Sequence, residues 1–215
     1  MLMTRIFLVR HGKTVFNKET TFRGVLDVPL NDVGKEQAAL TGRAMSGIPM
    51  DVIKTGPLSR AFDTAAEIAL HQEAKPVPEE AFNDLDFGRW QGLTLSEVEE
   101  TEPELLHRWQ SEPQSVRLPG GESIEDVSAR SVAALDKLVE ENEGKNILIV
   151  SHRVVIKLLS LHMLGMPVSG FWKIWIDTCG ITEFHSDPRF GYILVRLNNT
   201  AHLGRLEPNS REKDF

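Results

Sequence analysis

The chain has 215 residues, 41% of them hydrophobic and 26% charged, a composition typical of a folded globular protein and unlike that of fibrous or disordered chains. Its formal net charge of −7 disfavours general binding to nucleic acid or to an anionic membrane, because both require a basic surface. Cys179 is the lone cysteine, which excludes an internal disulfide and a cysteine-built metal site and favours a cytoplasmic location.

The first half of the chain alternates strand and helix patterns. A short apolar run at residues 6–9 predicts a buried strand, and residues 52–55 predict a second short strand. Asn31 or Asp32 is expected to cap the helix between them, and residues 59–71 show a second helical pattern after a turn.

The second half begins with an irregular region and returns to regular elements. Residues 75–94 carry prolines and glycines and predict a strand followed by a loop. Residues 84–122 include a helical pattern broken near Pro103 and are expected to cover a site. A capping-box pattern at Ser123 predicts a long helix to about residue 142. The elements expected after it are a strand at 147–150, a helix at 154–164 and strands at 180–185 and 191–197.

We expect one domain over residues 1–203, followed by a charged tail at 204–215. The most apolar long segment, residues 158–176, is interrupted by polar residues, glycines and Pro167, so no membrane span is expected. The N-terminus shows no signal-peptide pattern. Because residues 158–176 suit either a core or a subunit interface, a homodimer is left open.

Two histidines are predicted to lie at strand ends. His11 follows the first apolar run, and His152 follows the run at residues 147–150. The alternation of strands and helices predicts an α/β fold, a mostly parallel central sheet flanked by helices on both faces. Such sheets bind ligands beyond the carboxyl ends of their strands, so the two histidines can meet in one crevice if their strands are neighbours.

The residues around these strand ends suit phosphoryl transfer. Arg10 and Arg60 each lie at a strand-to-helix junction, and guanidinium groups bind phosphate oxygens in a bidentate way. A neutral imidazole such as that of His11 can attack phosphorus, and a carboxylic acid on a facing loop can protonate the departing oxygen. The candidates for this acid are Asp84, Asp86 and Glu80. A pocket of this kind needs neither metal nor cofactor.

Residues 8–17, Leu-Val-Arg-His-Gly-Lys-Thr-Val-Phe-Asn, resemble the nucleophile motif of the histidine phosphatase superfamily, in its phosphoglycerate-mutase-like branch. Further blocks agree with that family in the same order between residues 5 and 203. They are Gly24 with Asp27, residues 29–38, 57–65, 84–92, 119–123 and 150–152. The resemblance implies a phosphoglycerate-mutase-like fold and activity on a small phosphorylated metabolite.

The resemblance also implies roles for particular residues. His11 matches the nucleophile that becomes phosphorylated. The phosphate-binding positions are matched by Arg10, Arg60, His152 and Asn17. Asp84 stands at the position of the proton donor, where the family usually has the longer glutamate.

Three basic residues depart from the family pattern. Lys13 stands where an acidic residue is common, Arg23 where glutamine is common, and Arg153 where glycine is common. We expect Arg23, Gly24 and Arg153 to contact the substrate, and the added positive charge favours a substrate with a second anionic group.

The function expected from these observations is that of a metal-independent phosphomonoesterase with a phosphohistidine intermediate. The first alternative is a phosphoglycerate mutase, but such mutases carry a longer insertion and a different run after the acid, whereas residues 87–94 resemble the phosphatases. The second alternative is a non-catalytic protein that binds a phosphorylated ligand. The retained arginines, histidines and carboxylate disfavour it. Phosphoserine, α-ribazole phosphate, phosphoglycerate and sugar phosphates are all compatible with such a pocket.

Overall fold

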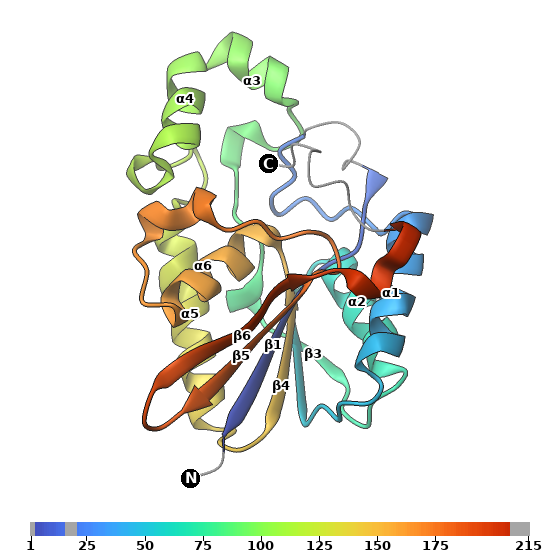
Figure 1. Ribbon diagram of the computed structural model, residues 1–215. Coiled ribbons are helices and arrows are strands. Elements are labelled where there is room, and N and C mark those ends of the chain that lie inside the picture. Colours follow the sequence, from blue (N-terminus) through green and yellow to red (C-terminus); the bar gives the residue numbers. More distant parts are fainter. Residues whose placement is uncertain (1–2, 16–20, 207–215) are drawn as a thin grey trace.

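A six-stranded sheet forms the centre of the protein in the computed structural model, which describes residues 3–15 and 21–206 (Figure 1). The strands lie in the order β3-β2-β4-β1-β5-β6. Their bounds are β1 Thr4–Arg10, β2 Val52–Thr55, β3 Pro76–Pro78, β4 Asn146–Ser151, β5 Ile181–Asp187 and β6 Gly191–Asn199. The first four strands in this order are parallel, whereas β5 runs antiparallel to both β1 and β6.

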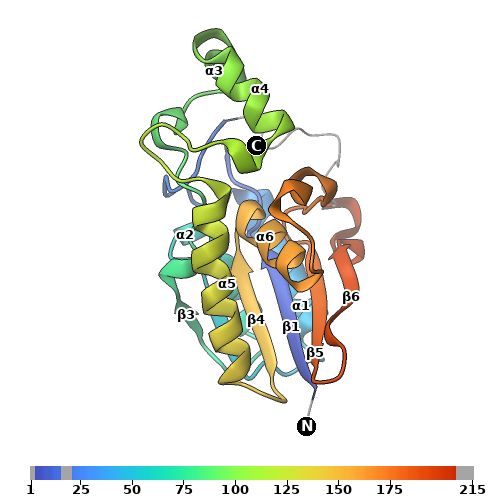
Figure 2. The same ribbon diagram turned by 90° about the vertical axis from the view of Figure 1, so that its left-hand side faces the viewer.

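Helices cover both faces of the sheet and the end at which β1 and β4 finish. The helices are α1 Asp32–Met45, α2 Ser59–Ala69, α3 Leu95–Thr101, α4 Pro103–Ser111, α5 Ile124–Glu140 and α6 Arg153–Met163. α1 and α2 lie on one face, and α5 and α6 lie on the other (Figures 1 and 2). α3 and α4 form a cap beyond the strand ends. The expected α/β fold with a mostly parallel sheet is confirmed.

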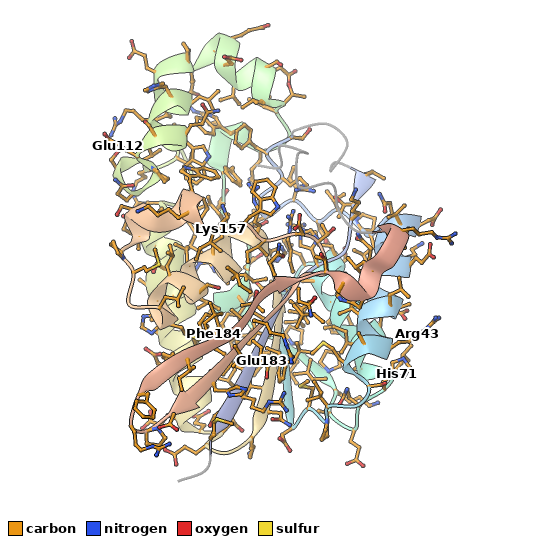
Figure 3. All side chains as sticks on the ribbon, viewed as in Figure 1. Arg43, His71, Glu112, Lys157, Glu183 and Phe184 are labelled. Atoms are coloured by element: carbon orange, nitrogen blue, oxygen red, sulfur yellow. The ribbon has the colours of Figure 1, made fainter. Side chains whose placement is uncertain are left out.

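The sheet buries side chains on both of its faces, because successive strand residues point in opposite directions. On β5, Phe184 joins the core under α5 and α6, while Glu183 points to the other face (Figure 3). The carboxylate of Glu183 is buried and accepts hydrogen bonds from Arg5 and Arg196, each at 2.8 Å. A buried charge is thus compensated by two guanidinium groups.

Local hydrogen bonds explain where the helices begin. Asn31 is the N-cap of α1, and its side chain accepts from the Gly34 backbone N–H at 2.8 Å. Ser123 and Asp126 form a capping box at the start of α5, as predicted. The expected break near Pro103 separates α3 from α4, because proline takes the first helical position, where its missing N–H costs nothing.

The apolar segment at residues 158–176 belongs to the core. Leu158, Leu159, Phe171 and Ile176 are all buried within the chain, so a subunit interface is not needed to account for them. In the part of the chain that the structure describes, no helix is both long enough and apolar enough to cross a membrane.

Most of the expected charged tail, residues 207–215, lies outside the described residues. A 3₁₀ helix, η6 (Ala201–Leu206), continues past residue 203, where the charged tail was expected to begin. The side chain of Gln37 on α1 donates to the Leu206 carbonyl at 3.1 Å. The backbone of Leu206 is therefore tied to α1, while Gly204 and Arg205 are exposed.

Gly34→Ala is expected to lower the free energy of unfolding by about 1–3 kcal/mol, although alanine normally favours a helix. The added Cβ would collide with the backbone carbonyl of Lys13, which cannot move without shifting the loop after β1. Gly47→Ala is the matched control, because no atom lies within 4 Å of its Cβ position. Urea unfolding followed by circular dichroism measures both variants, and equal stabilities would contradict this account.

Candidate active site

The pairing of β1 with β4 brings the two strand-end histidines together. Arg10 lies opposite Ser151, and the backbone N–H of His11 donates to the Ser151 carbonyl at 3.0 Å. The ring centroids of His11 and His152 are 5.3 Å apart, and both rings are buried. The structure therefore places both histidines in one crevice, as their strand-end positions suggested.

A backbone carbonyl determines which nitrogen of His11 carries the proton. Nδ1 lies 2.7 Å from the carbonyl oxygen of Gly12, which can only accept a hydrogen bond. In the neutral ring, Nδ1 therefore holds the hydrogen and Nε2 keeps its lone pair. The N–H of Gly12 donates to the Thr64 hydroxyl at 3.1 Å, which ties this loop to α2.

Arg60 enters the site from the first turn of α2 and is fully buried. Its Nη1 donates to the Leu26 carbonyl at 2.8 Å, and its Nη2 donates to the Gly24 carbonyl at 2.7 Å. Nη2 also lies 3.1 Å from Oδ2 of Asp84. Arg10 is buried as well, and its Nη1 donates to a backbone carbonyl at 2.9 Å. These contacts hold the Arg10 guanidinium at the end of β1 and the Arg60 guanidinium at the start of α2.

Asp84 reaches the same place from an irregular segment, residues 83–87. Its Oδ2 lies 3.1 Å from Arg60 Nη2 and 3.5 Å from His152 Nδ1. Its Oδ1 accepts from the Leu85 backbone N–H at 3.0 Å. One carboxylate oxygen thus faces the catalytic candidates while the other anchors the side chain to its own loop.

The two rival acids have other surroundings. Oδ1 of Asp86 accepts from the Gly88 N–H at 2.8 Å, which is a local turn contact. Glu80 is exposed on a short 3₁₀ helix, η2 (Glu80–Phe82). Asp84 lines the pocket, whereas the lining described below includes neither rival.

A small basic pocket lies beside these groups; Arg60 and His152 contact Asp84, which lines it, but are not themselves part of the lining. The pocket has an empty volume of about 290 Å³. The lining residues are Arg10, His11, Arg23, Gly24, Asp84, Phe87, Arg153 and Val154. Arg23 donates to the Thr14 hydroxyl at 3.0 Å, and the guanidinium of Arg153 lies 6.0 Å from the Trp175 ring. Lys13 is not part of this lining, and Asn17 lies outside the described residues.

Burial and positive neighbours lower the pKa of both histidines. Burial is the main cause for His11, and repulsion from Arg60 and Arg10 takes its pKa well below 6.5. Burial lowers the pKa of His152 to about 3, despite the attraction of Asp84. Both rings are therefore neutral at pH 7, which is the state in which Nε2 of His11 can act as a nucleophile.

The pKa of Asp84 reflects two opposing effects. Burial raises it, but attraction to the neighbouring side chains outweighs burial, and the pKa lies below the ordinary value. Because His152 is neutral at pH 7, we attribute the lowering to the ion pair with Arg60. Asp84 is thus a carboxylate at pH 7.

Sequence reasoning did not single out the two apolar residues of the pocket wall. Phe87 lies in the run at residues 84–92, and Val154 directly follows Arg153. The sequence offered one indication of their role, which is that both stand close to predicted site residues. Only the folded chain shows that their side chains line the pocket.

Comparison with known proteins places these features in a family. The sequence profile of the histidine phosphatase superfamily (branch 1) matches residues 6–200. Phosphoserine phosphatase 1 of Hydrogenobacter thermophilus is 34% identical over 202 residues, which cover 94% of this chain and 95% of that protein. The 2,3-bisphosphoglycerate-dependent phosphoglycerate mutase 2 of Gloeobacter violaceus is 31% identical over 201 residues, covering 90% and 91%.

A solved structure agrees with this relationship. The crystal structure of a phosphoserine phosphatase mutant from Entamoeba histolytica in complex with phosphoserine has a TM-score of 0.82 and 30% sequence identity. The alignment covers 93% of this chain and 99% of that one. With a profile match over nearly its whole length, the protein belongs to the histidine phosphatase superfamily, branch 1.

Proposed function

We propose that this protein is a phosphomonoesterase that hydrolyses a small phosphorylated metabolite through a phosphohistidine at His11, without metal or cofactor. The hydrogen bond from His11 Nδ1 to the Gly12 carbonyl carries the proposal, because it leaves Nε2 as a nucleophile beside buried arginines. Relatives that are named phosphatases support the reaction class.

The reaction proceeds in two steps. In the first, Nε2 of His11 forms a bond to phosphorus while the ester oxygen leaves with a proton from Asp84. Arg10, Arg60 and His152 bind the equatorial oxygens as their charge develops. In the second, water attacks phosphorus, Asp84 takes a proton from that water, and the P–N bond breaks with its electron pair returning to Nε2.

Asp84 must hold a proton in the first step although its pKa is low. A phosphate dianion beside the carboxylate adds negative charge and competes with it for Arg60, and both effects raise the pKa of Asp84. A phosphomonoester has a second pKa of about 6, so it can bring the required proton into the pocket. Substrate binding therefore raises the pKa of Asp84 and supplies the proton that Asp84 donates.

The substrate we propose carries a second anionic group. Arg23 and Arg153 line the pocket together with Arg10 and His11, and guanidinium groups match carboxylates as well as phosphates. Phosphoserine is the first candidate, because it has a carboxylate and because a 34% identical relative is named a phosphoserine phosphatase. The cytoplasmic location and the homodimer stay predictions.

A phosphoglycerate mutase is the second candidate function, favoured by the 31% identical relative of that name. In that reaction the phosphohistidine returns its phosphoryl group to the reoriented substrate rather than to water. The run at residues 87–94 and the two short helices of the cap, α3 and α4, favour hydrolysis.

His11→Ala is expected to reduce turnover by roughly 10,000-fold or more while leaving the fold intact, because the nucleophilic nitrogen is removed. Acid-sensitive label from ³²P-phosphoserine, trapped by rapid denaturation and located by peptide mapping, should lie on His11. The control His107→Asn removes an exposed imidazole of α4 and should label like the unsubstituted protein. Label on a serine or an aspartate would contradict the proposal.

The neutral state of His152 is testable without an activity assay. Its pKa is about 3 in the folded protein against 6.5 ordinarily, so the unfolded chain binds the extra proton as the pH falls. The contribution of this pKa difference to the free energy of unfolding is fully present above pH 6.5 and is lost as the pH falls from 6.5 to 3. Between pH 7.5 and 5.0, urea unfolding should show His152→Asn losing about 2 kcal/mol less than the unsubstituted protein. Equal losses would show that His152 is already charged in the folded state.

Asp84→Asn is expected to slow phosphoserine hydrolysis by roughly 100- to 10,000-fold. Hydrolysis of p-nitrophenyl phosphate should fall far less, because its leaving group scarcely needs a proton. The exposed Glu80→Gln serves as control and should change neither rate. If Asp84→Asn slows both substrates equally, the proton donor is one of its rivals.

The two candidate reactions are separated by assaying 3-phosphoglycerate in excess EDTA. We expect free phosphate release that needs neither a divalent metal nor 2,3-bisphosphoglycerate. Conversion to 2-phosphoglycerate that outpaces phosphate release, and that the bisphosphate stimulates, would establish the mutase instead. Loss of phosphate release on EDTA addition would contradict metal independence.

A further inference from the structure

Arg130, in the first half of α5, binds the backbone that carries Asp84. Its Nη1 donates to the carbonyls of Ala81 and Asn83, and its Nη2 donates to the carbonyl of Asp84, each at 2.9 Å. Its Nε and Nη2 donate to the Glu122 carboxylate, also at 2.9 Å each. Because arginine has five N–H donors, these contacts use all of them.

Glu122 extends this network to the residues after Asp84. Its backbone N–H donates to the Asp86 carbonyl at 2.9 Å, and its Oε2 accepts from the Asp86 N–H at 3.1 Å. The loop around Gly121 comes so close that a Cβ there would collide with the Asp86 carbonyl. Asp84 is therefore held between two anchored stretches of backbone.

The segment depends on these side-chain contacts for its shape. In the described structure, residues 83–87 belong to neither a helix nor a strand. Their carbonyls lack the partners that a regular ladder provides, and Arg130 supplies partners for those of Asn83 and Asp84 instead. The Arg130–Glu122 pair is bidentate and three-quarters buried, since the two side chains are 24% and 27% exposed. Pairs of this geometry are among the stronger hydrogen-bonded contacts in proteins.

The short side chain of Asp84 makes the backbone position decisive. An aspartate has one methylene fewer than the glutamate expected at this position, so its carboxyl has little reach of its own. Its Oδ2 must stay near Arg60 and His152, from which it is 3.1 and 3.5 Å away. A displacement of about 1 Å at a catalytic group can cost roughly 100-fold in rate.

We propose that Arg130, supported by Glu122, is a positioning residue that holds Asp84 in place for proton transfer. This inference rests on the proposed role of Asp84 as general acid. All five N–H donors of Arg130 are used by backbone carbonyls and by Glu122, so it acts through the Asp84 segment and not on the substrate.

The test compares Arg130→Gln with the unsubstituted protein on two substrates, phosphoserine and p-nitrophenyl phosphate. We expect kcat/KM for phosphoserine to fall roughly 10- to 100-fold more than that for p-nitrophenyl phosphate, because only the first reaction needs the proton. Lys137→Gln, which removes an exposed cation from the same helix, should leave both values unchanged. Equal slowing of both substrates by Arg130→Gln would overturn the inference and indicate a purely structural role.

Arg130→Lys keeps a positive charge opposite Glu122 but loses the fork that binds three carbonyls. Its kcat/KM should also fall more for phosphoserine than for p-nitrophenyl phosphate. Arg130→Lys takes the place of Arg130→Gln in the test if thermal unfolding shows that Arg130→Gln does not fold. A loss shared equally by the two substrates would overturn the inference here too.

The double variant Asp84→Asn with Arg130→Gln ties the effect to Asp84. Its substrate selectivity should match that of Asp84→Asn alone, since a misplaced acid costs nothing once the acid is gone. A further selective loss in the double variant would overturn the inference. If Asp84→Asn itself is not selective, the proposed role of Asp84 falls and the inference with it. If Asp84→Asn is selective and the Arg130 variants are not, only the positioning role is overturned.

Discussion

The parallel pairing of β1 with β4 is the contact on which the site depends. It places Arg10 beside Ser151 and brings the two imidazole rings to within 5.3 Å of each other. Both strands bury side chains on both faces, so a slip of one residue would exchange the contents of two separate cores. Hydrophobic burial therefore fixes the register, and the register fixes the distance between His11 and His152.

The second constraint is electrostatic. Several guanidinium groups are gathered in a buried pocket, which is costly unless each positive charge has partners. Backbone carbonyls and Asp84 provide them for Arg60, and a carbonyl does so for Arg10. The histidines accommodate the same field by staying neutral, as the lowered pKa of His11 and of His152 indicates. A pocket of this kind favours an anion and keeps the imidazole of His11 unprotonated.

The sheet and the irregular segment at residues 83–87 hold the residues of the site in different ways. Strand ends hold His11, Arg10 and His152 through backbone ladders, which need no particular side chain for support. Asp84 has no such ladder, and its position depends on the side chains of Arg130 and Glu122. His11 and Asp84 are therefore held by different kinds of interaction, and the position of Asp84 is the more sensitive of the two to single substitutions.

Much of the fold could be predicted from the sequence, because the relevant signals are local. The strand at Val52–Thr55, the cap at Ser123 and the strand ends at His11 and His152 all follow from periodicity and capping within a few residues. The family resemblance favoured Asp84 over Asp86 and Glu80, but periodicity and capping could not make that choice. The direction of that irregular segment is set by Arg130, 46 residues farther along the chain from Asp84. The sequence alone therefore determined which elements form and which chemistry they carry. Tertiary structure decided which carboxylate faces the histidines, because contacts between distant residues leave no local pattern.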